Sequence, residues 1–93
     1  MSDEQLILFV TGNAPRSRRA RANLAQALTA ADAASPEYQE IDLTREPQCM
    51  VEYGIFATPA LASVGPGGLI AVLYGDLSNE TALHRFLQQE VAG

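Results

Sequence analysis

The chain has 93 residues, a formal net charge of −5 and an apolar fraction of 47%. A chain of this length suits one domain, so we expect a single domain over residues 1–93. The acidic balance argues against general nucleic-acid binding. The longest strongly apolar run, Leu6–Val10, is too short to span a membrane, and the acidic start Met1–Gln5 does not resemble a secretory signal. The single cysteine, Cys49, cannot form an intramolecular disulfide, so we expect a cytoplasmic protein without membrane association.

The first half of the chain alternates strand and helix patterns. The continuous apolar run Leu6–Val10 predicts a strand that is buried on both faces. A helix is predicted from about Pro15 to Ala31, because alanine and leucine recur there at helical spacing and proline fits a first helical turn. Tyr38–Leu43 predicts a second strand, and a short helix over about Pro47–Tyr53 should end at Gly54.

The second half carries a hairpin pattern followed by a helix. Ala60–Val64 and Leu69–Tyr74 flank a Gly-Pro-Gly-Gly turn, which predicts two antiparallel strands. Ser78 is the expected N-cap of a last helix. The first two strands, joined by a helix, should be parallel. The order β-α-β-α-β-β-α therefore predicts an α/β protein with a single thioredoxin-like domain and a mixed four-stranded sheet.

The residues that carry chemistry in thioredoxins are absent here. The site of their Cys-x-x-Cys motif reads Ala14-Pro15-Arg16-Ser17, so dithiol exchange is excluded. We expect Cys49 in the core. Thr58-Pro59 matches the cis-proline position of this fold, where we expect a structural loop. His84 is the only histidine, so a zinc site is not expected, and neither are catalytic residues or a cofactor.

Four of the six arginines lie between Arg16 and Arg21. Helical geometry places Arg16 and Arg19 with Asn23 on one flank of the apolar stripe, and Arg18 and Arg21 on the other. Cations in a first helical turn oppose the helix dipole, and exposed ion pairs contribute little to stability. We therefore predict that these four arginines and Asn23 bind a partner. The alternative is a solvated basic face whose arginines pair with Asp or Glu of the same chain.

Four short motifs follow one another along the chain. They are Leu8–Pro15 followed by Ser17 and Arg19-Ala20, Ile41–Leu43 with Pro47-Gln48, Ala57–Leu61, and Gly75–Ser78. Together, over about residues 6–91, they resemble the circadian clock protein KaiB family. The resemblance implies a non-enzymatic regulatory module that binds a KaiC-like ring ATPase and modulates its phosphorylation or ATPase cycle. It also implies KaiA-like or SasA-like proteins as further partners or competitors.

The KaiB family also has a resting form with a rearranged second half, which is the alternative fold. Clock members carry basic residues on the second-half strands, where this chain has about Ser63, Ala71 and Val72. Their final helix has a Gly and an Asp that favour rearrangement, where Phe86 and Gln88 stand here. Phe86 continues the apolar stripe without the helix penalty of glycine. We therefore predict that the thioredoxin-like form is the resting state.

Two other functions compete with this reading. A glutathione-binding domain would use Ser17 in place of a catalytic cysteine, the Thr58-Pro59 backbone for the tripeptide, and Ser78 at a helix N-terminus for its carboxylate. A self-associating structural module would pair an edge strand or the exposed second half between copies, which makes a homo-oligomer.

Overall fold

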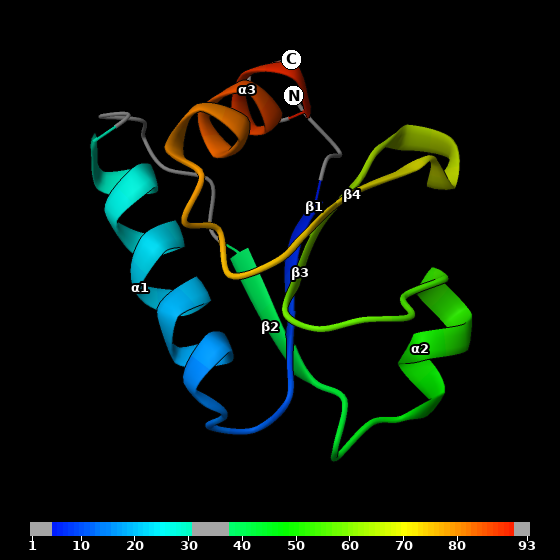
Figure 1. Ribbon diagram of the computed structural model, residues 1–93. Helices are drawn as coiled ribbons and strands as arrows, with labels where there is room; N and C mark the ends of the chain where they lie inside the picture. Colours follow the sequence, from blue (N-terminus) through cyan, green and yellow to red (C-terminus); the bar gives the residue numbers. More distant parts are fainter. Residues whose placement is uncertain (1–4, 31–37, 91–93) are drawn as a thin grey trace.

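A computed structural model describes residues 5–30 and 38–90 of the chain (Figure 1). The elements are β1 (Gln5–Val10), α1 (Pro15–Ala30), β2 (Tyr38–Asp42), α2 (Gln48–Tyr53), β3 (Ala60–Val64), η1 (Pro66–Gly68), β4 (Ile70–Tyr74) and α3 (Glu80–Glu90). This order confirms the predicted β-α-β-α-β-β-α arrangement. The predicted helix end at Ala31 and the first four residues of the acidic start Met1–Gln5 lie outside the described residues. No helix in the described part of the chain combines the length and apolar character needed to cross a membrane.

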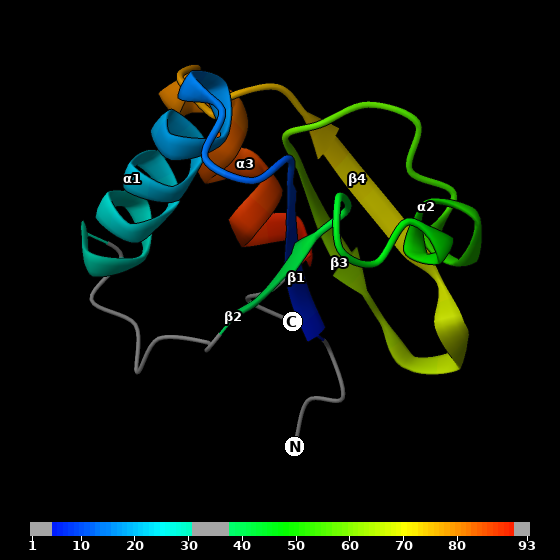
Figure 2. The ribbon, with the colours of Figure 1, turned by 90° about the horizontal axis from the view of Figure 1, so that it is seen from below.

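The four strands form one mixed sheet in the order β2-β1-β3-β4. β1 is parallel to β2 and antiparallel to β3, and β3 is antiparallel to β4. The helices α1 and α3 cover one face of the sheet, whereas α2 covers the other (Figures 1 and 2). This three-layer arrangement is the predicted thioredoxin-like fold, and it leaves β2 and β4 as the edges of the sheet.

The central strand β1 supplies both hydrophobic cores. Because side chains alternate along a strand, Leu6, Leu8 and Val10 pack with α1 and α3, while Ile7 and Phe9 pack on the α2 side. All five side chains are buried. This explains why the sequence of β1 is apolar at every one of these positions instead of at alternate ones.

The helix α1 packs closely on the sheet through small and branched side chains. Ala20, Leu24, Ala27 and Leu28 are buried in the core between α1 and the sheet. Phe86 of α3 is partly buried against the same core. The helical conformation of α3 places the second half of the chain in the thioredoxin-like form and not in the rearranged alternative.

The last helix begins one residue later than predicted, with Asn79 instead of Ser78 at its start. The Asn79 Oδ1 accepts a hydrogen bond from the Ala82 N–H at 3.0 Å, and the Asn79 carbonyl accepts one from the Leu83 N–H at 3.0 Å. Ser78 instead donates its N–H to the Asp76 carboxylate at 3.1 Å and hydrogen-bonds the same carboxylate through its side chain. Ser78 therefore belongs to the preceding turn.

Candidate protein-binding surface

Two turns of related sequence hold the first half of α1 against the sheet. One is Asp42-Leu43-Thr44, at the end of β2, and the other is Asp76-Leu77-Ser78, before α3. In each turn the aspartate accepts hydrogen bonds from the residue two positions later, and the leucine between them is buried. Asp42, Leu43 and the whole second triplet lie in the motifs that resemble the KaiB family, and the structure gives both turns a physical role as anchors for α1 and the loop before it.

Asp42 joins the end of β2 to the loop that leads into α1. Its Oδ1 accepts hydrogen bonds from the Thr44 hydroxyl at 2.7 Å, the Thr44 N–H at 2.9 Å and the Gly12 N–H at 3.1 Å. The Thr44 side chain, followed by these two backbone N–H groups, lowers the pKa of Asp42 below its ordinary value. The carboxylate is thus stabilised in its charged form.

Asp76 performs the equivalent role on the opposite flank of α1. Its carboxylate accepts hydrogen bonds from the Ser78 side chain and N–H, and from the Arg19 Nε at 3.2 Å. The Ser78 hydroxyl is the largest cause of a lowered pKa for Asp76, followed by the Arg19 guanidinium. Asn23 of α1 donates to the Asp76 carbonyl oxygen at 2.9 Å, so two α1 side chains bind this one turn.

The lowered pKa values predict a loss of stability in acid. A carboxyl group with a depressed folded-state pKa stabilises the fold above its unfolded-state pKa, and this contribution is lost as the pH falls through the folded-state pKa. Stability should therefore decline below about pH 4, where unfolded aspartates begin to protonate. We expect Asp42→Asn to be less stable than the wild type at pH 7 and to show a weaker dependence on pH between about pH 5 and pH 2.

Urea unfolding at a series of pH values measures this dependence. Glu46→Gln is the matched control, because Glu46 is exposed and lies in the same loop. An Asp42→Asn protein whose stability falls with acid as steeply as that of the wild type would contradict the assigned role of the Asp42 carboxylate.

The predicted arginine cluster divides into paired and exposed members. Arg19 pairs with Asp76 on one flank, and Arg21 lies on the other flank, where its Nε contacts both carboxylate oxygens of Glu40 at 2.9 Å. These two arginines therefore form ion pairs with acidic residues of the same chain, as the alternative hypothesis expected. Arg16 and Arg18 are exposed and have no ion-pair partner within residues 5–30 and 38–90.

Arg21 also fixes the loop before α1 through the backbone. Its Nη2 donates to the Gly12 carbonyl oxygen at 2.8 Å, and its Nη1 donates to the Asn13 Oδ1 at 3.3 Å. Of the five residues predicted to bind a partner, Arg19, Arg21 and Asn23 thus have hydrogen-bond partners within the chain itself. The sequence showed the cluster of arginines. It could not show which of them form ion pairs, because that depends on where the fold places Glu40 and Asp76.

The loop before α1 meets the loop before β3 at the same end of the sheet. The hydroxyls of Thr11 and Thr58 are hydrogen-bonded to each other, and the Thr58-Pro59 peptide bond is cis, as predicted. The Thr11 N–H donates to the Ser17 Oγ at 3.1 Å, and Ser17 is only 1% exposed. Ser17 is therefore a structural acceptor and not an accessible substitute for a catalytic cysteine.

The geometry also opposes the glutathione hypothesis at Ser78, its predicted carboxylate contact. A peptide carboxylate placed beside the N–H of Ser78 would meet the Asp76 carboxylate, which already accepts that hydrogen bond. Like charges at this distance repel. Neither Ser17 nor Ser78 therefore offers the contact that a glutathione site would need.

The one thiol of the chain is placed in the core, as expected. Cys49 is buried among the residues of α2 and the sheet. Burial raises the pKa of the Cys49 thiol, and the nearby carboxylates of Glu52 and Glu46 raise it further. A thiol that stays protonated is a poor nucleophile, so Cys49 has a packing role.

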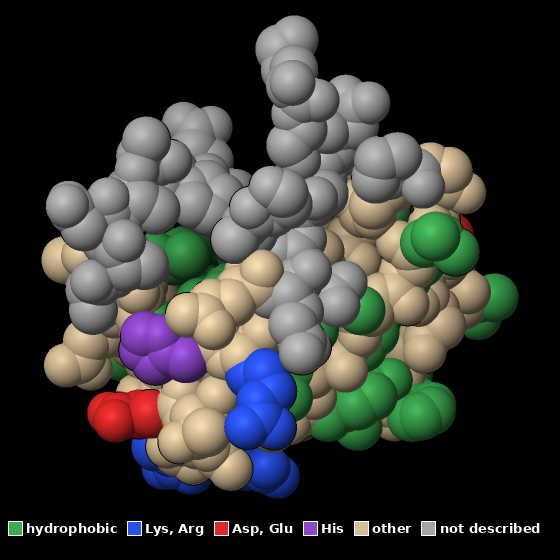
Figure 3. Space-filling model, turned by 90° about the horizontal axis from the view of Figure 1, so that it is seen from above, with side chains coloured by type: hydrophobic (Ala, Val, Ile, Leu, Met, Phe, Trp, Pro, Cys, Tyr) green, Lys and Arg blue, Asp and Glu red, His purple; other side chains and the backbone are tan. Residues whose placement is uncertain are grey.

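An exposed apolar surface lies on the α2 and β4 side of the molecule. The ring of Phe56, which is 76% exposed, stacks on the ring of Tyr74 with centroids 5.1 Å apart. Met50 and Val51 of α2 are also exposed. Figure 3 shows hydrophobic side chains on the β4 side of one face, apart from His and Arg side chains. Sequence periodicity could not reveal Phe56 as exposed, because it lies in a loop outside any helix or strand.

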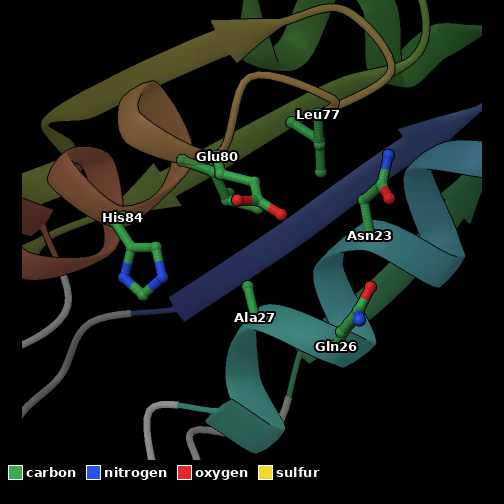
Figure 4. Close-up of a pocket in the computed structure, with 7 residues that line it drawn as sticks. Asn23, Gln26, Ala27, Leu77, Glu80 and His84 are labelled. Carbon is green, nitrogen blue, oxygen red and sulfur yellow. The ribbon is translucent and has the colours of Figure 1, made fainter.

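A pocket of about 240 Å³ lies between α1 and α3 (Figure 4). Glu80 and His84 of α3 line it opposite Asn23, Gln26 and Ala27 of α1. In the described part of the chain, no three His, Cys, Asp or Glu side chains cluster in a way that could hold a metal ion. We therefore assign no chemistry to this pocket.

Comparison with known proteins is consistent with this geometry. The N-terminal domain of Synechococcus elongatus SasA aligns with a TM-score of 0.76 and 29% identity, covering 100% of this chain and 88% of that chain. Mitochondrial thioredoxin 3 from Saccharomyces cerevisiae aligns with a TM-score of 0.77 and 20% identity, over 96% of this chain and 80% of that chain. Fasciola hepatica thioredoxin aligns with a TM-score of 0.75 and 16% identity, over 94% and 80% of the two chains.

The two thioredoxins share the fold with this chain, and their low identity carries no further implication. No curated protein sequence matches the chain at a significant level. The KaiB domain matches residues 7–89, which is nearly the whole chain and includes all four motifs. The chain therefore belongs to the KaiB family.

Proposed function

We propose that the chain is a non-enzymatic regulatory module that binds a KaiC-like ring ATPase and modulates its phosphorylation or ATPase cycle. The observation that carries this proposal is a thioredoxin-like scaffold without its thiol pair, in a member of the KaiB family. Ala14 and Ser17 occupy the two positions of that pair, and Ser17 is buried. We therefore expect the surface around the start of α1 to bind a partner protein.

The exposed arginines are the proposed contacts on this surface. Arg16 lies in the first turn of α1, where a positive charge opposes the helix dipole, and Arg18 follows it within the same half of the helix. A carboxylate of the partner would compensate this charge and could accept two parallel hydrogen bonds from a guanidinium. Arg19 and Asn23 support the surface by fixing α1 to the Asp76 turn, and Arg21 supports it by fixing α1 to Gly12 and to Glu40 of β2.

SasA-like and KaiA-like proteins are the proposed further partners or competitors. The SasA N-terminal domain has the same fold as this chain. Two proteins with one fold and related motifs would compete if both occupy the same surface of a KaiC-like ATPase. Adding a SasA-like domain should then displace the chain from the ATPase.

Binding to a nucleotide-loaded KaiC-like ATPase from the same source tests the proposal. Size-exclusion chromatography with light scattering should show a complex with the wild-type chain. We expect Arg16→Glu combined with Arg18→Glu to weaken binding at least about tenfold, because each substitution places a negative charge against a partner carboxylate. Both positions are exposed, so circular dichroism should show an unchanged fold.

Arg45→Glu combined with Arg85→Glu is the charge-matched control for the double variant, since both arginines are exposed and lie outside α1. Its affinity should stay close to that of the wild type. If no KaiC-like ATPase changes its elution or its ATPase rate, the proposed partner is wrong. If a complex forms and the double variant binds as well as the wild type, the arginines do not belong to the interface.

A further inference from the structure

The two edges of the sheet differ in charge. β2 carries Glu40 and Asp42, and the Arg21 side chain pairs with Glu40 at this edge. β4 has the sequence Ile-Ala-Val-Leu-Tyr, without a charged residue or a proline. No strand pairs with its outer side among the described residues. An uncharged, unpaired edge strand is a template for the addition of another strand.

The hydrogen bonds at the two ends of the β3–β4 pair reveal which backbone groups of β4 point outward. The Gly75 N–H donates to the Pro59 carbonyl at 2.9 Å, and the Gly65 N–H donates to the Leu69 carbonyl at 2.7 Å. Antiparallel strands alternate between hydrogen-bonded and non-hydrogen-bonded residue pairs. Counting inward from these two pairs in the observed register, the even-numbered residues of β4 form the non-hydrogen-bonded pairs. The residues whose N–H and C=O groups face the open edge are Ile70, Val72 and Tyr74.

We infer that β4 pairs with β4 of a second copy of this chain, antiparallel and about a two-fold axis at Val72. In this register Val72 lies opposite Val72 of the second copy, and Ile70 lies opposite its Tyr74. Each of the three residues then donates one N–H and accepts one hydrogen bond, so three donors in each of two copies give six bonds. The pairing satisfies every outward backbone group of β4 and closes as a two-fold dimer.

The side chains along this seam are compatible with the pairing. Val72 packs with the core on the α2 side, and Tyr74 stacks on Phe56 on that same side. Ile70 and Tyr74 are 39% and 38% exposed, and cross-strand contact would cover both. Aromatic side chains opposite aliphatic ones are favourable cross-strand pairs. On the other face of β4, Ala71 would lie opposite Leu73 of the second copy.

The charges favour a second copy over other strands. A strand that resembles β2 would place Glu40 or Asp42 against an apolar edge and leave its charge uncompensated. A second β4 brings no charge to the seam. Each chain carries a net charge of −5, so two copies repel at long range, and salt screens this repulsion. The proposed dimer should therefore become tighter as the salt concentration rises, unlike a complex held by arginine–carboxylate pairs.

Sedimentation or light scattering of the purified chain alone, over a range of concentrations and salt, tests the inference. We expect a monomer–dimer equilibrium for the wild type that shifts toward dimer in salt. Ile70→Lys should weaken dimerisation at least tenfold, because it places a lysine beside Tyr74 of the other copy. Val51→Lys is the matched control, since Val51 is 87% exposed on α2, and it should dimerise like the wild type.

Hydrogen exchange provides a second readout that needs no variant. The Val72 amide should exchange more slowly as the protein concentration rises, because its N–H points outward in the monomer. A wild-type chain that stays monomeric at millimolar concentration in high salt would overturn the inference. So would equal effects of Ile70→Lys and Val51→Lys, or an assembly larger than a dimer. None of these measurements uses the ATPase, so the outcome is independent of the proposed function.

Discussion

A variant with Ala14→Cys and Ser17→Cys is expected to gain a redox-active dithiol that the natural chain lacks. The Arg18 N–H donates to the Ala14 carbonyl at 3.0 Å, so Ala14 lies at the N-terminus of α1 and Ser17 one turn further along. A thiol at position 14 would have a lowered pKa, because the helix dipole and the Arg16 guanidinium favour its thiolate. The buried thiol at position 17 would then resolve a mixed disulfide.

Insulin reduction driven by dithiothreitol measures this gain of activity. The double variant should reduce insulin disulfides, and the wild type should match the rate without protein. Under mild oxidation the double variant should form one intramolecular disulfide, seen as a mass loss of about 2 Da, since two thiols lose their protons and two electrons pass to the oxidant.

Ser17→Cys alone is the control for the dithiol variant. It leaves only one thiol at the start of α1 and should show no reductase turnover. Measurable turnover by the wild-type chain would contradict the proposal of a non-enzymatic module. A correctly folded double variant that forms no disulfide would show that the start of α1 departs from thioredoxin geometry.

Replacing Phe86 by glycine, together with Gln88→Asp, is expected to destabilise the thioredoxin-like form by about 2–4 kcal/mol. Glycine in a helix interior costs about 1 kcal/mol relative to alanine, and removal of a partly buried aromatic ring costs about a further 1–3 kcal/mol. The ring of Phe86 packs on the core between α3 and the sheet. Small domains are stable by only about 5–15 kcal/mol, so this is a large part of the total.

Thermal unfolding should show a Tm lower by roughly 8–32 °C, at about 4–8 °C for each kcal/mol in a domain of this size. Hydrogen exchange over residues 80–90 should accelerate more than exchange in β1. The substitutions introduce the glycine and aspartate that the family resemblance leads us to expect in clock members. NMR chemical shifts would reveal whether residues 83–90 then leave the helical state.

Phe86→Leu and Gln88→Asp, each made alone, are the controls for this variant. Leucine keeps both the helix propensity and much of the apolar contact, and Gln88 is exposed, so each should change stability far less than the combined variant. An unchanged Tm in the combined variant would show that packing of α3 does not hold the second half in its present form.

Several parts of the fold could be predicted because they depend on local patterns. The apolar run Leu6–Val10 indicated a strand buried on both faces, and the structure confirms it. The Thr58-Pro59 position indicated a cis peptide bond, which is present. The predicted Ser78 cap was wrong, because Asn79 supplies the side-chain oxygen that accepts from the helix, whereas the Ser78 side chain is hydrogen-bonded to Asp76. Two adjacent residues that can both cap a helix are distinguished only by the turn that precedes them.

The candidate surface was predicted only in outline, for a similar reason. Helical spacing separated the arginines into two flanks, and the structure places Arg19 and Arg21 accordingly. Their partners, Asp76 and Glu40, are 57 and 19 residues away along the chain. Pairing over such distances depends on how the elements pack, and no local pattern encodes it. The exposure of Phe56 could not be predicted, because a loop residue does not take part in the periodic pattern of a helix or strand.

The sequence by itself determined the order of the elements, the membership of a family and the absence of a thiol pair. These properties depend on residue type and short-range spacing, which act before the chain is packed. Only the tertiary structure decided which arginines remain free, that Ser17 is buried, and that β4 presents an uncharged open edge. Each of these depends on contacts between distant segments, and such contacts exist only once the sheet and helices are assembled.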